Sequence, residues 1–181
     1  MKDKMQYLLT LVNDWLKFAE AKNGILIAFN GAAIFGLLQG WSSLNDYIVP
    51  FAKYWFIPCS VISLIIAFSS FIPDLDIVAI LNKVASRNKV PVNKINIFYF
   101  GQIKDVSAEE YVKELYLSEN LPLPQLISRS EIDLANQIII NSKIAWQKYK
   151  SFEYASTLTL IGVVIPIFLI GIKSIIQIFG K

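Results

Sequence analysis

Three long apolar segments constrain the fold of this chain most strongly. They cover residues 24–41, 54–72 and 157–172, and the third reaches residue 179 if its apolar tail lies along the membrane interface. A helix of about 20 apolar residues crosses a bilayer core of roughly 30 Å. The 181-residue chain is 55% hydrophobic and 17% charged, far more apolar than a soluble domain of this length. We therefore predict an all-α membrane protein with three transmembrane helices. A soluble all-helical protein is the alternative, but little other sequence would remain to cover three such helices.

The distribution of basic residues predicts the orientation. The N-terminal arm and segment 73–156 carry 14 of the 17 Lys and Arg residues. By the positive-inside rule, the N-terminus and segment 73–156 are cytoplasmic and the C-terminus is outside. Aromatic residues near the ends of the spans fit interfacial belts. The outer belt would hold Trp41, Tyr47, Tyr54 and Trp55, and the inner belt Trp15, Phe18, Trp146, Tyr149 and Tyr154.

The remaining segments are predicted to be mainly helical. Residues 1–22 form an amphipathic helix that lies on the membrane or continues into the first span. Segment 74–89 is expected to be helical, whereas "INIFYFGQI" favours a short strand or an extended segment. Ser107 and Glu110 have the spacing of a capping box that starts a helix. From Ser130 no helix breaker occurs before Pro166, which predicts one long helix passing from the cytoplasm into the membrane.

Small residues recur every four positions along the first span. On a helix they form one ridge that allows another backbone to approach closely. The ridge either packs against the second or third span of the same chain or joins copies in an oligomer. Its members are Gly24, Ala28, Ala32, Gly36 and Gly40.

Polar residues interrupt the same span. Asn30 lies on roughly the opposite face from the ridge, and a buried amide in lipid is costly. It is either a hydrogen-bonded strut within one chain or part of a polar ring at the axis of an oligomer. Glu20 and Lys22 lie where this helix meets the cytoplasmic head groups, so Lys22 is expected to anchor the span and to pair with Glu20 or an acidic residue of segment 73–156.

The composition excludes several classes of function. The chain has no histidine and a single cysteine, Cys59, which argues against metal sites, disulfides and most hydrolytic mechanisms. No catalytic motif or phosphate-binding loop is present. The net charge of +3 is too small to indicate nucleic acid as a partner. We expect no catalytic residues, no metal and no cofactor, and an intramembrane enzyme is the weakest hypothesis.

Several short motifs occur together in a recognisable order. They are "F-A-x-x-K" at 18–22, "N-I-F-Y-F-G-Q-I" at 96–103, "S-A-E-E-Y" at 107–111, "D-L-A-N-Q-I" at 133–138 and "K-Y-K-S-F-x-Y-A" at 148–155. With these motifs the chain resembles the Pycsar effector (PycTM-type) transmembrane family of bacterial antiviral defence. The resemblance implies an effector of the bacterial inner membrane that responds to a nucleotide second messenger and impairs membrane integrity.

The resemblance also implies a cyclic nucleotide as ligand. The other partners expected are the lipid bilayer and, through the ridge of the first span, further copies of the chain in a homo-oligomer. Segment 73–156 is too short and too helical for a cyclic-nucleotide-binding β-roll, so either a smaller site forms between chains or another protein senses the messenger. A nucleotide would need cationic groups for its phosphate and aromatic rings for its base. The alternative for these residues is contact with anionic lipid, and the alternative for the whole protein is a non-toxic membrane scaffold that docks a cytoplasmic partner. The candidates are Arg87, Tyr99, Lys104, Lys148, Tyr149 and Lys150.

Overall fold

A computed structural model describes residues 1–40, 48–72 and 95–179 of the chain. All elements in the described residues are helical, and three helices are long and apolar enough to span a membrane. The chain forms two compact units. Unit 1 comprises Met1–Glu20 and Pro73–Tyr149, and unit 2 comprises Ala21–Ile72 and Lys150–Lys181.

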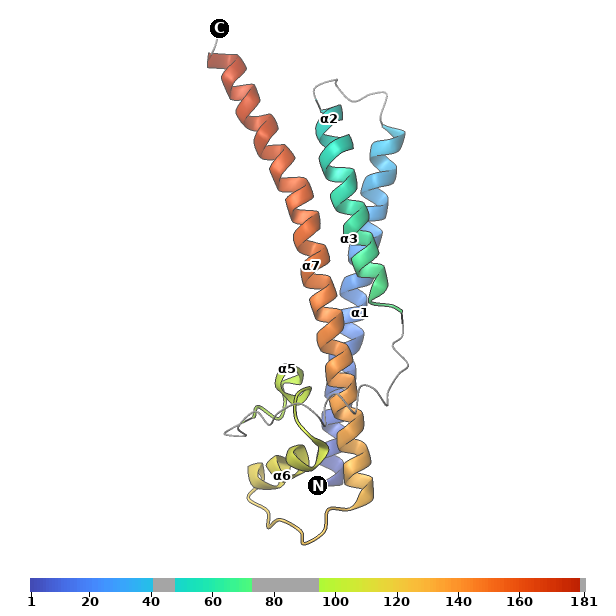
Figure 1. Ribbon diagram of the computed structural model, residues 1–181, viewed down its shortest axis with the longest axis vertical. Helices are drawn as coiled ribbons and strands as arrows, with labels where there is room; N and C mark the ends of the chain where they lie inside the picture. The colour runs from blue at the N-terminus through green and yellow to red at the C-terminus, as the bar shows by residue number, and fades with distance from the viewer. Residues whose placement is uncertain (41–47, 73–94, 180–181) are drawn as a thin grey trace. The chain divides into compact units, whose positions relative to one another are not determined.

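Two long helices contribute to both units. Helix α1 covers Lys2–Gln39, so the predicted amphipathic arm and first span form one continuous helix. Helix α7 covers Arg129–Phe179 with Pro166 inside it, which confirms the prediction of one long helix (Figure 1). The predicted helix at 74–89 and the aromatic residues Trp41 and Tyr47 lie outside the described residues.

Unit 1 has an ordinary apolar core. The first part of α1, the short helix α5 (Phe100–Ile103), helix α6 (Ala108–Ser118) and the first part of α7 surround it. Burial of such side chains contributes about 1.5–3 kcal/mol each for the larger ones. The largest fully buried residues of the unit 1 core are Met5 and Leu8 from α1, Ile103 from α5, Tyr111 and Leu115 from α6, and Ile138 and Ile139 from α7.

Helix α6 has a defined cap at each end. At its start, the backbone N–H of Glu110 donates to Ser107 Oγ and the backbone N–H of Ser107 donates to the Glu110 carboxylate, which confirms the predicted capping box. At its end, Asn120 adopts a φ of 54°. The N–H groups of Asn120 and Leu121 then donate to the carbonyls of Leu117 and Tyr116, the Schellman arrangement that satisfies the last turn.

The segment predicted as a strand is a turn followed by one helical turn, so that prediction was wrong. Asn96 explains the difference, because its side-chain Oδ1 accepts the backbone N–H of Phe98 at 3.0 Å. Such a local bond favours a turn over a strand. Helix α5 then begins after Tyr99. A Cβ on Gly101 would lie 2.6 Å from the Tyr99 ring, so this position has room only for glycine unless the ring moves.

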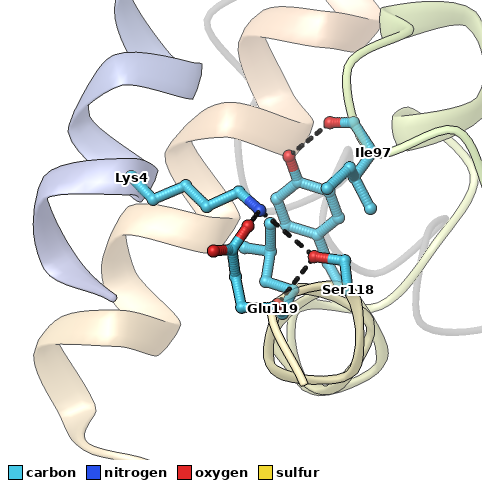
Figure 2. A network of polar contacts seen from close by, with 6 residues as sticks. Lys4, Ile97, Ser118 and Glu119 are labelled. Atoms are coloured by element: carbon cyan, nitrogen blue, oxygen red, sulfur yellow. Dashed lines mark hydrogen bonds and ion pairs between the residues drawn. The ribbon is translucent and has the colours of Figure 1, made fainter. Parts of the chain in front are cut away.

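Polar contacts connect the start of α1 to the end of α6 within unit 1 (Figure 2). The ammonium group of Lys4 donates to Ser118 Oγ at 3.2 Å and forms an ion pair with Glu119. Nearby, the hydroxyl of the buried Tyr111 donates to the carbonyl of Ile97 at 2.9 Å. Burial also raises the pKa of Tyr111, so its phenol remains a hydrogen-bond donor at physiological pH.

Unit 2 contains three apolar helical segments. They are the rest of α1, the rest of α7 and a continuous helical stretch formed by α2 (Val49–Phe51), the π-helical turn η2 (Ala52–Phe56) and α3 (Ile57–Ser69). Helical backbone thus begins at Val49, before the predicted start of the second span at Tyr54. Pro50 is tolerated because it occupies the first turn of the stretch, where no intrahelical N–H bond is required. Pro58 lies two residues after the π-helical turn η2, where the hydrogen-bonding pattern of the stretch changes.

The interior of unit 2 differs from that of unit 1. Within its described part, no residue larger than asparagine is fully buried, while large apolar residues such as Phe29, Ile65 and Phe168 are exposed. Small residues between helices and apolar residues outside are the pattern expected when lipid surrounds a bundle. The buried positions are Asn23, Asn30, Ala52, Ser60, Ser63, Ala67, Ala155, Thr159, Gly162 and Pro166.

Candidate functional site

A polar cluster joins the three apolar helices inside unit 2. Asn30 of α1 is 1% exposed, and its Nδ2 donates to Thr159 Oγ1 of α7 at 2.9 Å and to Ser63 Oγ of α3 at 3.3 Å. The Ser63 and Thr159 hydroxyl oxygens are themselves 2.9 Å apart. The carbonyl of Leu26 lies 3.0 Å from Asn30 Nδ2 and is a third acceptor that shares its two hydrogens. One residue from each of the three helices therefore takes part in the same cluster of hydrogen bonds.

Each hydroxyl in this cluster has a backbone partner as well. Ser63 Oγ donates to the carbonyl of Ala155 at 2.8 Å, and Thr159 Oγ1 reaches the same carbonyl at 3.1 Å. Unsatisfied polar groups are costly where water is excluded, so a fully bonded cluster is compatible with a lipid environment. It can hold the three helices in one register without any residue carrying a charge.

The small-residue ridge lies away from this cluster. Ala28, Ala32 and Gly36 are exposed, and a Cβ on Gly24 or Gly36 would meet no other atom within 4 Å. A Cβ on Gly40 would meet only the carbonyl oxygen of Gly36 on the same helix. The described part of the chain therefore does not use the ridge for its own helix packing. Contact between copies through this ridge stays a prediction.

Both predicted anchor residues, Glu20 and Lys22, contact residues of α7. Glu20 forms an ion pair with Lys148 of α7 at 3.2 Å, and both residues belong to unit 1. The Lys22 ammonium lies 5.3 Å from the centroid of the Phe152 ring, within cation–π distance. Glu20 thus links α1 to α7, while Lys22 contacts an aromatic ring.

Aromatic side chains cluster in unit 1 around Phe100. The Phe100 ring stacks on Tyr149 with ring centroids 5.2 Å apart, and its centroid lies 5.8 Å from that of Trp15. The rings of Tyr99 and Trp146 complete the group at centroid distances of 5.2 Å and 6.3 Å from Phe100. Phe100 is buried, whereas Trp15 and Tyr99 are 40% and 43% exposed. The cluster thus offers aromatic surface to a ligand from outside.

The candidate nucleotide-binding residues are only partly brought together. Tyr99 and Tyr149 belong to the aromatic cluster, and the Lys104 ammonium lies 4.9 Å from the Trp146 ring centroid. Lys148 pairs with Glu20, and Lys150 lies in unit 2, where it pairs with Glu153 at 2.6 Å. Lys104 pairs with Asp105. Each of these lysines therefore already has a carboxylate partner, and Arg87 lies outside the described residues.

Sequence reasoning missed several members of both groups. Ser63 and Thr159, which are the hydrogen-bond partners of Asn30, could not be recognised in the sequence because single hydroxyl residues are common in apolar helices. Trp15, Phe100 and Trp146 were not proposed as part of a ligand site. Trp15 and Trp146 are two of only four tryptophans in the chain, which is the signal that was available.

The all-helical fold, the three candidate spans and the polar contacts between them define a multi-pass membrane protein. Residues 4–174 match the Pycsar effector protein domain, PycTM. The chain belongs to this family, and the resemblance noted in the sequence is confirmed. Membership places it among the membrane effectors of antiphage defence. No curated protein and no solved structure shows significant similarity to the chain.

Proposed function

We propose that this protein impairs the integrity of the bacterial inner membrane when a cyclic nucleotide activates it, and that it acts as a homo-oligomer. The observation that carries the proposal is the contrast within unit 2, where polar and small residues face inward and large apolar residues face outward. A bundle whose interior is held by a few uncharged hydrogen bonds can rearrange in lipid at modest cost. The family match supplies the biological setting.

The nucleotide site is proposed at the aromatic cluster. The exposed ring of Tyr99 would stack on the base, and Lys104 would bind the phosphate after releasing Asp105. Lys148 is a second candidate, and its capture by phosphate would release Glu20 of α1. Ligand binding would then break a contact between the two long helices. No enzymatic step is required by this scheme.

The oligomer contact is proposed at the small-residue ridge. Its exposed positions have open space around them, so a second helix can approach the backbone there. The proposed orientation has the N-terminus and segment 73–156 in the cytoplasm and the C-terminus outside. The uneven distribution of Lys and Arg supports this orientation.

The test is membrane potential and dye entry in bacteria that express the chain, with and without candidate cyclic nucleotides. We expect depolarisation that requires a nucleotide and disappears in Gly36→Leu. This substitution adds a bulky side chain on the ridge, yet meets open space within one chain. Gly171→Leu is the matched control, since Gly171 is also exposed and unobstructed but lies on α7.

Three results would contradict the proposal. A normal potential under every nucleotide, with the protein present in the membrane, would favour the scaffold that docks a cytoplasmic partner. Depolarisation without any nucleotide would show that a cyclic nucleotide is not needed for activation. Equal activity of Gly36→Leu and wild type would remove the ridge from the oligomer contact.

A further inference from the structure

An apolar groove of about 330 Å³ lies between the three helical segments of unit 2. Side chains from all three segments line it, and almost no polar atom faces it. On α1 it adjoins the face that carries Asn30, since Ala33 follows one turn later. The lining residues that matter here are Ala33, Leu37, Phe51, Phe56, Val163 and Pro166.

The groove begins where the helices stop packing closely. At Gly162 an added Cβ would lie 2.9 Å from Cys59 Cβ, so α3 and α7 touch there. Beyond this point, α7 and α2 diverge towards the C-terminal end of α7 (Figure 1). Protein interiors are close-packed, and apolar spaces of this kind are not hydrated. In a bilayer, hydrocarbon is the medium available to fill the groove.

We propose that the groove binds one acyl chain of a phospholipid and that Lys53 contacts the phosphate of its head group. Lys53 is exposed and follows Ala52, which lines the groove, and it is the only basic residue within 24–72. The next residues, Tyr54 and Trp55, are exposed aromatics of the kind found at head-group level. The acyl-chain site and the cation are therefore neighbours in the chain. The proposal does not depend on nucleotide activation.

Native mass spectrometry of the full-length protein in mild detergent, with added phosphatidylglycerol or phosphatidylcholine, tests the site. Wild type is expected to retain one phospholipid of either kind. Val163→Trp and Leu37→Trp each fill the groove from a different helix and are expected to reduce lipid retention roughly tenfold, equivalent to about 1.4 kcal/mol. Val164→Trp and Leu38→Trp are the matched controls, because these adjacent residues are 56% and 58% exposed and do not line the groove.

The head-group contact is tested separately with Lys53→Gln. We expect retention to fall roughly twofold to fivefold for both lipids, as for the loss of one exposed ion pair. Equal retention by Lys53→Gln and wild type would overturn this contact. Failure of wild type to retain lipid, or equal retention by the groove and control variants, would overturn the acyl-chain site. A wild-type dimer that both groove variants dissociate, with no lipid bound, would assign the groove to a second copy.

Discussion

Asn30 occupies a position where an unpaired amide would be costly, because the neighbouring helices exclude water and the surrounding residues are apolar. Its hydrogen bonds connect α1 to α3 through Ser63, which is 33 residues away in sequence, and to α7 through Thr159, which is 129 residues away. The two hydroxyls also bond to the carbonyl of Ala155, a contact in which Asn30 takes no part. Asn30 is thus the member of the cluster that links α1 to the other two helices.

Asn30→Leu is expected to lower the free energy of unfolding by about 1 kcal/mol, since interhelical hydrogen bonds in membranes contribute about 0.6 kcal/mol each on average. Titration of the purified protein with a denaturing detergent would measure the change. Phe29→Leu is the matched control at an exposed neighbouring position and should leave stability nearly unchanged. Equal stability of Asn30→Leu and wild type would mean that the cluster does not hold α1 in place.

Tyr111→Phe is expected to lower the free energy of unfolding of unit 1 by about 1–3 kcal/mol. The substitution keeps the buried ring but leaves the carbonyl of Ile97 without its 2.9 Å bond. Hydrogen exchange at the amides of 96–103 would report the loss as faster opening. Tyr116→Phe is the control, since the hydroxyl of Tyr116 bonds a partly exposed Glu131. Faster exchange in Tyr116→Phe than in Tyr111→Phe would contradict this assignment.

At the scale of elements, the contact between α3 and α7 depends on the absence of a side chain at Gly162. In Gly162→Ala the new Cβ would lie 2.9 Å from Cys59 Cβ, so the helices must move apart. We expect the free energy of unfolding to fall by about 1–3 kcal/mol, as for other overpacked interiors. At Gly171 an added Cβ meets no other atom within 4 Å, so Gly171→Ala should instead raise the free energy of unfolding by up to about 1 kcal/mol through its higher helix propensity.

Thermal unfolding in detergent would rank these two variants. The double variant Gly162→Ala with Cys59→Gly removes the opposing Cβ and should recover part of the loss, which a double-mutant cycle would measure as coupling. Stability of Gly162→Ala equal to that of Gly171→Ala would show that the two helices are not in close contact at this point.

Sequence alone could predict the helices better than their partners. The long α7 followed from the absence of a breaker between Ser130 and Pro166, and the start of α6 followed from the Ser107 capping box. The strand prediction at 95–103 failed because a local bond from the Asn96 side chain to the backbone outweighs β-branched and aromatic composition. The positions that face one another across unit 2 are distant in sequence, so no local pattern could pair Asn30 with Thr159.

At the scale of the whole molecule, the two units have opposite interiors. The core of unit 1 contains Met, Leu, Ile and Val, as in proteins folded in water, whereas the interior of unit 2 contains Asn, Ser, Thr, Ala and Gly. The hydrophobic effect stabilises the first arrangement, and close packing with uncharged hydrogen bonds stabilises the second. From this contrast we infer that unit 1 folds in the aqueous phase and unit 2 in lipid.

This inference predicts the sidedness of single cysteines in a Cys59→Ala background. Leu126→Cys lies in the loop between α6 and α7 at a position that is 87% exposed, and Tyr54→Cys lies near the start of the second helical stretch at 72% exposure. In spheroplasts, a membrane-impermeant maleimide should label Tyr54→Cys directly. It should label Leu126→Cys only after the inner membrane is permeabilised, because a single predicted span separates the two positions and the positive-inside rule predicts that unit 1 is cytoplasmic. The reverse pattern would invert the topology, whereas equal labelling of both positions in spheroplasts would mean that the second helical stretch does not cross the bilayer.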